Sequence, residues 1–171
     1  MYNIAQFFIS NENITNFKRD VKKPRDCVIN ALELIGILQS SYADIMRIAV
    51  GDYGLDTSQI EQIFYYVQSN FRWKFVRYTN IDTLVQFCLQ TLQPSHVIFC
   101  GYSMIVNGTI FKHVFLIGKT NQLEIKYMDP QINAFCNLDE INCYNNIGGA
   151  QEYYILQTTA DSHQIQQMQD L

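Results

Sequence analysis

The stretch VIFCGYSMIVNGTIFKHVFLIG, residues 97–118, decides the fold because it predicts a β-hairpin. Two runs rich in β-branched and aromatic residues flank Asn107-Gly108, a dipeptide typical of a two-residue hairpin turn. Similar runs follow later in the chain. The expected strands are 97–106, 109–118, 123–128 and 152–158. The second half of the chain therefore predicts an antiparallel sheet.

The first half of the chain predicts helices. In the segment from Cys27 to Gln39, apolar residues occur on nearly all sides and only Asn30 and Glu33 interrupt them, which is typical of a buried central helix. Asp26, just before it, is a suitable N-cap. Further helices are expected at 42–50, at 58–69 with Ser58 and Glu61 as a capping box, and at 81–91 after Asn80, with a turn at 51–54.

These elements predict an α+β fold in which N-terminal helices, including a buried helix that begins with Cys27, pack on a C-terminal antiparallel sheet. A chain of 171 residues with 48% hydrophobic and 16% charged residues is typical of one packed domain. We expect that domain to span residues 1–158 and to be followed by a polar, Gln-rich tail at 159–171.

The charge of the chain argues against nucleic acid as its main partner, since the net charge is −4 and the isoelectric point is about 5.2. One basic cluster departs from this balance just before Cys27. It could be a solvated loop, a source of positive field beside the thiol, or a docking patch for an acidic partner. Its members are Lys18, Arg19, Lys22, Lys23 and Arg25.

The five cysteines are an odd number without tight pairing, which favours reduced thiols and an intracellular or cytoplasmic location. Cys88 and Cys100 lie in apolar runs, as core residues do. Cys136 and Cys143 have no partner at metal-binding spacing, so zinc is not expected. The sequence predicts neither a signal peptide nor a membrane span, and its aromatic content is compatible with a homodimer.

A His–Asp pair is expected within the sheet. Alternation places His113 on the same face as Phe115, and a three-residue loop at 120–122 would pair apolar residues across the next hairpin. In that register Phe115 faces Tyr127 and His113 faces Asp129. Because directly opposed residues have Cβ atoms about 5 Å apart, the imidazole and the carboxylate could share a hydrogen bond.

Cys27 has two interpretations. Free cysteines are among the most often buried residues, so Cys27 could be a packed core thiol. A cysteine at the first turn of a helix also experiences the helix dipole, which stabilises a thiolate, and a nearby imidazole extends that effect. With Asp129 to orient His113, the chain contains the three groups that nucleophilic thiol catalysis needs.

Three short motifs carry a resemblance to a known family. The segments DCVINAL (26–32), HVFLIG (113–118) and MDP (128–130) resemble the papain-like cysteine peptidases, most closely the C39 peptidase-like domains. The resemblance covers residues 20–157. It implies a papain-like fold with Cys27 as nucleophile, His113 as general base and acid, and Asp129 as the orienting residue, with no metal or organic cofactor.

Two departures from that family pattern concern the oxyanion hole. Members of the family usually have a Gln several residues before the Cys, and a small residue after it. Here Val28 follows the Cys, and no Gln stands at the usual distance upstream. Removal of one oxyanion donor costs about 3 kcal/mol of transition-state stabilisation. The substitutes that the chain offers upstream are Gln6, Asn11, Asn13 and Asn16.

The first expectation is a papain-like thiol hydrolase, a peptidase or isopeptidase that acts on a polypeptide through an acyl-enzyme. The same triad also serves acyl transfer and transglutamination. The alternative is a catalytically weak or inactive binding protein on the same fold, such as a viral, host-interacting module. A third interpretation is an unrelated α+β structural protein in which the order Cys27, His113, Asp129 is a coincidence.

Overall fold

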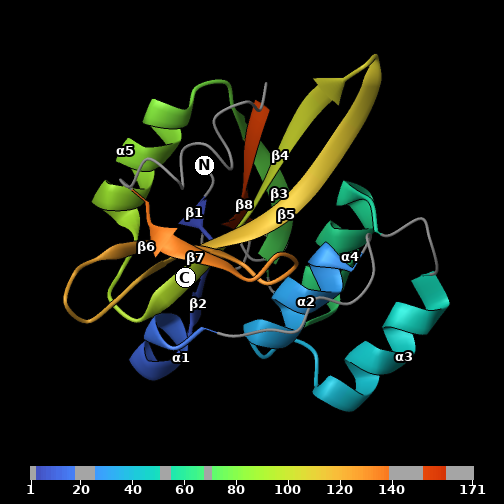
Figure 1. Ribbon diagram of the computed structural model, residues 1–171, viewed down its shortest axis with the longest axis horizontal. Coiled ribbons are helices and arrows are strands. Elements are labelled where there is room, and N and C mark those ends of the chain that lie inside the picture. Colours follow the sequence, from blue (N-terminus) through green and yellow to red (C-terminus); the bar gives the residue numbers. More distant parts are fainter. Residues whose placement is uncertain (1–2, 18–25, 51–54, 68–70, 139–151, 161–171) are drawn as a thin grey trace, which may run out of the picture.

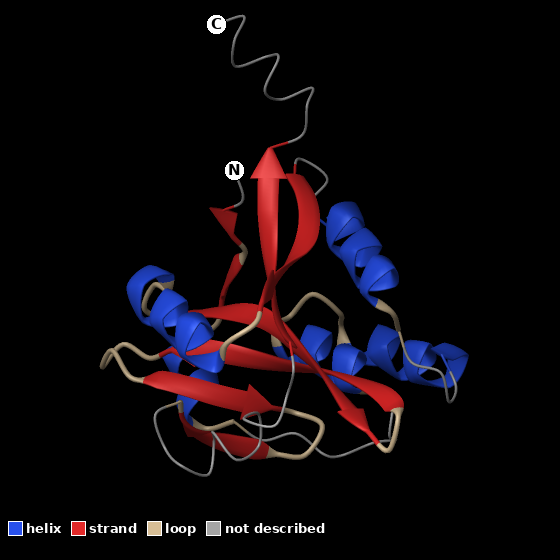
Figure 2. Cartoon of the chain, turned by 90° about the horizontal axis from the view of Figure 1, so that it is seen from above, coloured by secondary structure: helices blue, strands red, loops and turns tan. Residues whose placement is uncertain are grey.

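The computed structural model describes residues 3–17, 26–50, 55–67, 71–138 and 152–160 (Figure 1). These residues form an α+β fold built on one eight-stranded sheet in which every pairing is antiparallel. The order of the strands is β1-β8-β4-β5-β6-β7, while β2 pairs with β4 and β3 pairs with β8. Helices lie on both sides of the sheet (Figure 2). The expected α+β class is confirmed.

The bounds of the elements are as follows. The helices are α1 (Asn11–Thr15), α2 (Cys27–Leu34), α3 (Ser40–Val50), α4 (Thr57–Val67) and α5 (Ile81–Thr91). The strands are β1 (Asn3–Ile4), β2 (Gln6–Phe8), β3 (Phe71–Tyr78), β4 (His96–Val106), β5 (Thr109–Lys119), β6 (Ile125–Asp129), β7 (Ala134–Asn137) and β8 (Glu152–Ala160).

The hairpin of β4 and β5 is confirmed. Val106 pairs with Thr109 across a two-residue turn. Asn107 has a φ of 52° and Gly108 a φ of 80°, the left-handed conformation that this turn requires at both positions. The paired strands extend well beyond the rest of the sheet (Figure 1). Each strand is one residue longer than expected at the end away from the turn.

The register expected between β5 and β6 is wrong by two residues. Ile117 pairs with Tyr127, and Leu116 pairs with Met128. The loop has five residues instead of three, because the backbone N–H of Thr120 donates to Glu124 and the Thr120 hydroxyl accepts from the Glu124 N–H. A shift of two residues preserves the face on which each side chain lies, since side chains alternate with a period of two.

The bounds of three helices differ from expectation: α2 ends before Gln39, α3 begins at Ser40 rather than Tyr42, and α4 begins at Thr57 rather than Ser58. The helix that begins at Cys27 ends at Leu34, because the chain reverses at Gly36, which has a φ of 80°. At the start of α4, the capping pair is Asp56 and Gln59, each accepting a bond from the other's backbone N–H. The expected capping box of Ser58 and Glu61 is therefore wrong. Glu61 accepts from the Phe75 N–H in β3 instead.

Other expectations are settled in part. The helix after Asn80 is confirmed, and the Asn80 side chain caps it. β8 continues to Ala160, two residues into the expected tail. Strands β1, β2, β3 and β7 and helix α1 were not expected, so the first half of the chain is less purely helical than its pattern indicates. The turn expected at 51–54 and the tail from 161 onward lie outside the described residues.

Two buried clusters cover the two faces of the sheet. Alternate residues of β4 and β5 divide between them, with Phe99 and Leu116 on one side and Cys100 and Phe115 on the other. The first cluster packs against α2 and α4, and the second packs against α5. Helix α3 packs on α2, outside the first cluster. The sheet and α4 thus hold α2 in place, and with it the position of Cys27.

Candidate active site

Cys27 is the first residue of α2, and its side chain is half-buried. The residues that follow, from Val28 to Leu32, are buried, and α2 packs on β5. Asp26 occupies the N-cap position and is itself buried, but its side chain makes no capping hydrogen bond, so the expected cap is wrong in that respect. The helix is thus held by packing, and its first turn brings a reachable thiol to β5.

His113 and Asp129 meet despite the altered register. The Nε2 atom of His113 lies 2.5 Å from Oδ2 of Asp129, although in this register the two residues are diagonal neighbours rather than directly opposed. Diagonal neighbours lie within reach of long side chains. The pairing of β5 with β6 stops at Leu116 and Met128, so His113 lies beyond the last paired residues. The expected His–Asp contact is present, but by a different geometry.

The carboxylate of Asp129 is buried, with 1% of its side chain exposed, and it is surrounded by donors. The Tyr127 hydroxyl donates to Oδ2 at 3.2 Å, and the Gln131 backbone N–H donates to Oδ1 at 3.0 Å. An ionised carboxylate can only accept, so the His113 Nε2 atom must carry a proton. The other ring nitrogen, Nδ1, is then the one available to the Cys27 thiol.

The imidazole of His113 is held in its protonated form. Burial lowers its pKa, but hydrogen bonds with Asp129 and Cys27 and the charges of both groups outweigh burial and raise the pKa to about 10. Tyr102 lies directly across from His113 on β4, and the centres of the two rings are 5.4 Å apart. The site therefore combines a thiol, a charged imidazole and a carboxylate, with an aromatic ring against the imidazole.

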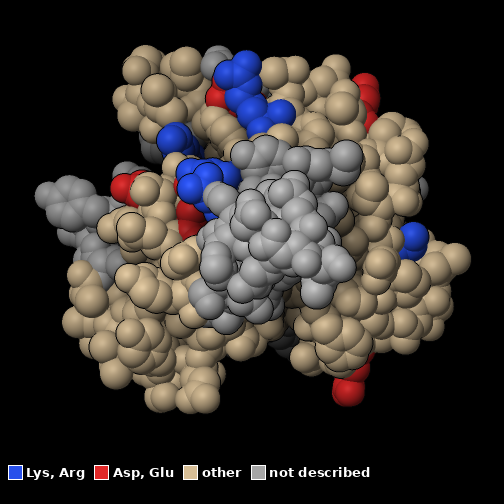
Figure 3. Space-filling view, turned by 180° about the vertical axis from the view of Figure 1, so that it is seen from behind, with Lys and Arg blue, Asp and Glu red and all other residues tan. Residues whose placement is uncertain are grey.

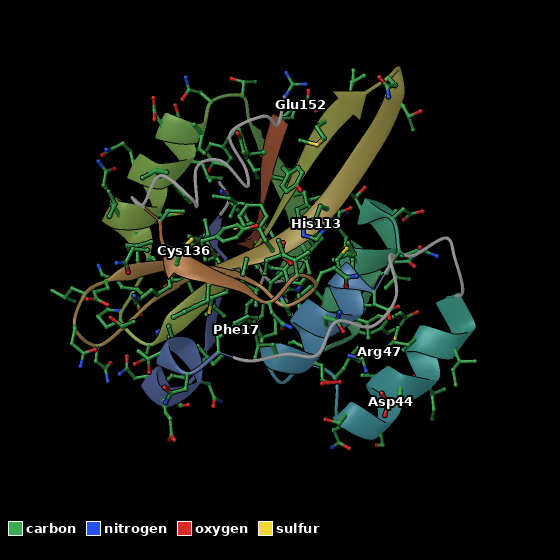
Figure 4. All side chains as sticks on the ribbon, viewed as in Figure 1. Phe17, Asp44, Arg47, His113, Cys136 and Glu152 are labelled. Carbon is green, nitrogen blue, oxygen red and sulfur yellow. The ribbon has the colours of Figure 1, made fainter. Side chains whose placement is uncertain are left out.

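A pocket that is partly open to solvent lies beside the thiol and the imidazole. In Figure 4 His113 lies where β5 passes the start of α2. Most of the lining is apolar, and the charged side chains of Asp56 and Lys112 are exposed. The lining residues are Cys27, Val28, Leu55, Asp56, Thr57, Ile60, Phe75, Gly101, Tyr102, Lys112, His113, Val114 and Tyr154.

The four amide side chains expected near the thiol do not line this pocket. Gln6 bonds with the backbone of Thr91 and Gln93 at the end of α5. Asn11 accepts from the Asn121 backbone at 2.8 Å. Asn13 and Asn16 are exposed on the short helix α1 and at its end. The structure does not bring these four residues to Cys27, so the expected oxyanion donors are wrong.

The remaining cysteines lie elsewhere. Cys88 and Cys100 are buried in the cluster under α5, and burial raises the pKa of Cys88 to about 12. Cys136 is a residue of β7 rather than of a loop, and it lies apart from His113 (Figure 4). Cys143 is outside the described residues. Cys27 is therefore the one cysteine of the described part that lines the pocket.

The basic cluster before Cys27 also lies outside the described residues: Lys18, Arg19, Lys22, Lys23 and Arg25 are not placed. On the face seen in Figure 3, the Lys and Arg side chains are few and acidic ones lie among them. Two described basic side chains of β3 pair with carboxylates: Arg77 with Glu152 at 3.0 Å and Lys74 with Glu61 at 3.7 Å. This face presents no broad basic surface among the described residues.

Sequence reasoning missed three residues that connect α3 to the triad, namely Arg47, Asn30 and Gln131. Asn30 and Arg47 are buried, and their hydrogen bonds lead through Gln131 toward Asp129. The only signal for them was that polar residues such as Asn30 interrupt an otherwise apolar helix. That signal did not identify the partners, because Asn30 and Gln131 are 101 positions apart in the sequence.

Within the described residues, no group of three or more His, Cys, Asp or Glu side chains is arranged to hold a metal ion. The helices of the same residues are all too short or too polar to cross a membrane. No family model matches the chain, and no curated protein matches it either. The resemblance to papain-like peptidases therefore stays a prediction from three sequence motifs.

Proposed function

We propose that this protein is a thiol hydrolase of the papain-like type, a peptidase or isopeptidase that uses Cys27, His113 and Asp129. The observation that carries the proposal is that Cys27 and His113 line the same pocket and that Asp129 bonds to His113. They come from α2, β5 and β6, which are far apart in the chain. A helix that presents a thiol at its first turn to a sheet histidine supports the papain-like arrangement.

The chemistry begins with the thiol. His113 is already protonated in the resting site, so the reactive form of Cys27 is the thiolate paired with that imidazolium, and the thiolate attacks the carbonyl carbon of the substrate. The protonated Nδ1 then donates its proton to the leaving amine as the C–N bond breaks, which leaves an acyl group on Sγ. Water attacks this thioester and passes its proton to Nδ1. The C–S bond then breaks, which releases the carboxylic acid and restores the thiolate–imidazolium pair.

Asp129 assists without reacting. It accepts from His113 Nε2–H, which fixes the tautomer and leaves Nδ1 toward the thiol. It also stabilises the imidazolium that persists while the thiolate exists. The Tyr127 hydroxyl and the Gln131 N–H hold the carboxylate in position. The backbone N–H of Cys27 has no partner within its own helix, because it is in the first turn, and it is the donor we assign to the oxyanion.

The pocket indicates the substrate class. Its walls are mainly apolar, with Leu55, Ile60 and Phe75 among them. A polypeptide with an apolar side chain close to the scissile carbonyl would bury that side chain there, at about 25 cal/mol for each Å² removed from water. The charged groups Asp56 and Lys112 are exposed and would meet the more polar part of the chain.

A second candidate is a binding protein on the same fold that has lost catalysis, such as a viral, host-interacting module. The observation that favours it is that none of the expected amide side chains reaches the pocket. An oxyanion hole with one donor fewer would slow hydrolysis by roughly a hundredfold to a thousandfold. Such a protein would still bind polypeptide but would release product slowly.

The test of the proposed function is covalent capture with a panel of peptide vinyl sulfones that carry an apolar, acidic or basic residue next to the reactive group. We expect mass spectrometry to find one adduct, on Cys27, formed fastest with the apolar member and abolished in Cys27→Ala. Turnover of the matching fluorogenic peptide separates an enzyme from a binding protein. The absence of any adduct on Cys27 with every member of the panel would refute the proposal.

A further inference from the structure

A chain of buried polar side chains connects α3 to the candidate triad. Asn30 lies one helical turn after Cys27 on α2, and it is completely buried. Arg47 of α3 is 6% exposed and donates twice to Oδ1 of Asn30, from Nε at 3.2 Å and from the second guanidinium nitrogen at 2.7 Å. In Figure 4 Arg47 lies between α3 and α2. The two helices are thus joined by a buried guanidinium–amide contact.

The charge of Arg47 is balanced locally. Glu33 of α2 lies 3.0 Å from its guanidinium group, and Asp44 of α3 lies 2.8 Å from it. Because burying a charge without partners is costly, these carboxylates make the buried guanidinium tolerable. They also fix the planar fork of the guanidinium group, whose remaining donors point at Asn30.

The contact with Arg47 sets the direction of the Asn30 amide. A guanidinium group can only donate, so the amide oxygen must face it and the amide nitrogen must face away. That nitrogen, Nδ2, donates to Oε1 of Gln131 at 2.8 Å. Gln131 follows β6, and its own backbone N–H donates to Oδ1 of Asp129. These polar contacts therefore lead from the cation of Arg47 to the carboxylate of Asp129, and the last two use the side chain and the backbone N–H of Gln131.

We infer that Arg47, Asn30 and Gln131 are positioning residues that hold the turn after β6 against α2 and thereby keep Asp129 on His113. This inference rests on the proposed function of the Cys27–His113 pair. It explains why a polar residue occurs in the apolar helix α2: Asn30 lies on the same helix as Cys27 and contacts Gln131, in the turn that follows Asp129. One helix would then set the spacing between Cys27 and Asp129.

The groups that face the imidazole come from three elements. They are Cys27 from α2, Asp129 from β6 and Tyr102 from β4, while Lys112 is the neighbour of His113 on β5 itself. Arg47 acts on the imidazole only through Asn30, Gln131 and Asp129. Loss of these hydrogen bonds should therefore change the alignment of Asp129 with His113, while the charges that surround His113 stay the same.

The test uses two substitutions at Gln131, a half-buried residue whose replacement spares the core. Gln131→Met removes the acceptor for Asn30 and keeps nearly the same volume, whereas Gln131→Glu retains an acceptor and is the matched control. In both variants the backbone N–H to Asp129 is retained. The primary measurement is the rate of alkylation of Cys27 by iodoacetamide at pH 6 and at pH 10, in the full chain.

We expect Gln131→Met to lower the rate at pH 6 by roughly tenfold to a hundredfold, as misplacement of a catalytic group does, while Gln131→Glu stays within about twofold of the wild type. At pH 10, where a thiol ionises unaided, the three proteins should react at similar rates. A change that is equal at both pH values would indicate altered access to the thiol and would overturn the inference. Equal rates for all three proteins at pH 6 would also overturn it.

A second pair of variants supports the same inference. If the residues act as one chain, Asn30→Ala and Gln131→Met together should cost no more at pH 6 than the worse of the two alone. Additive losses would overturn the inference. The proposed function fails in a distinguishable way: wild-type Cys27 would then alkylate slowly at pH 6, and the rate in His113→Ala would equal that in the wild type.

Discussion

Replacement of Asp129 by Asn tests the electrostatics of the site, because it removes the charge and keeps the volume. His113 and Asp129 are 18% and 1% exposed in their side chains. Burial lowers the pKa of His113, but Asp129 and Cys27 together raise it from 6.5 to about 10, which corresponds to on the order of 5 kcal/mol in favour of the protonated ring. We expect Asp129→Asn to remove about 3 kcal/mol of the free energy of unfolding at pH 6, as loss of one partner of a buried ion pair does.

The sign of the pH dependence follows from the direction of the pKa shift. Because the pKa of His113 is higher in the folded protein than in the unfolded chain, protonation of His113 stabilises the fold. This contribution is complete below pH 6.5, the unfolded pKa, and it is lost as the pH rises through about 10. The difference in unfolding free energy between wild type and Asp129→Asn should therefore be largest at pH 6. It should shrink steadily toward pH 10.

The assay is chemical denaturation of both proteins at pH 6, 8 and 10, with Tyr127→Phe as control. That control removes a neutral donor to the same carboxylate, so it should cost about 1 kcal/mol at every pH. A difference for Asp129→Asn that is the same at pH 6 and pH 10 would show that the charge of His113 is not what Asp129 stabilises.

Three further predictions concern the pocket, a helix cap and the buried thiols. In Gly101→Ala the new Cβ would lie 3.2 Å from the His113 carbonyl oxygen. This substitution should slow peptide hydrolysis severalfold and change the free energy of unfolding by no more than about 1 kcal/mol, as steady-state kinetics and denaturation would show. Asp56→Ala should lower the unfolding free energy by about 1 kcal/mol through loss of the reciprocal cap with Gln59, as urea denaturation would show. Cys88, with a pKa of about 12, should stay unmodified by iodoacetamide in the native protein at pH 8, and mass spectrometry of the alkylated peptides checks this.

The parts of the fold that local chemistry specifies were predictable. The turn at Asn107 and Gly108 needs two residues with positive φ, and few dipeptides other than Asn-Gly supply them so well. Asn80 caps α5 with its own side chain, again a local effect. The parity of the β5–β6 pairing was also predictable, because a slip of one residue would take Ile125 and Tyr127 out of the cluster that contains Phe115 and Ile117.

The register itself was not predictable, because apolar matching allows any slip of two residues. The loop conformation decided it, through the Thr120 hydroxyl bond to Glu124 and a φ of 66° at Leu123. The His–Asp contact survived because the two side chains are long enough to meet diagonally. The contact between His113 and Asp129 was therefore predicted correctly from a wrong register, because a shift of two residues leaves both side chains on the faces that were expected.

The surroundings of the triad depend on contacts between distant segments. Arg47 meets Asn30 because α3 packs on α2, and Asn30 meets Gln131 because the turn after β6 lies against α2. No periodicity in the sequence encodes those distances. The polar residues in α2 indicated that something buried needed them, and only the folded chain identifies the partners.

The pH dependence of iodoacetamide alkylation at Cys27, followed by mass spectrometry, tests most directly whether Cys27 and His113 form a reactive pair. The proteins to compare are wild type, His113→Ala and His96→Ala. His96→Ala is the control, because His96 bonds to the Pro94 carbonyl at the start of β4 and does not line the pocket. We expect rapid alkylation at pH 6 in wild type and in His96→Ala, and its loss in His113→Ala. Slow alkylation at pH 6 in all three proteins would contradict this expectation and would make Cys27 a packed thiol.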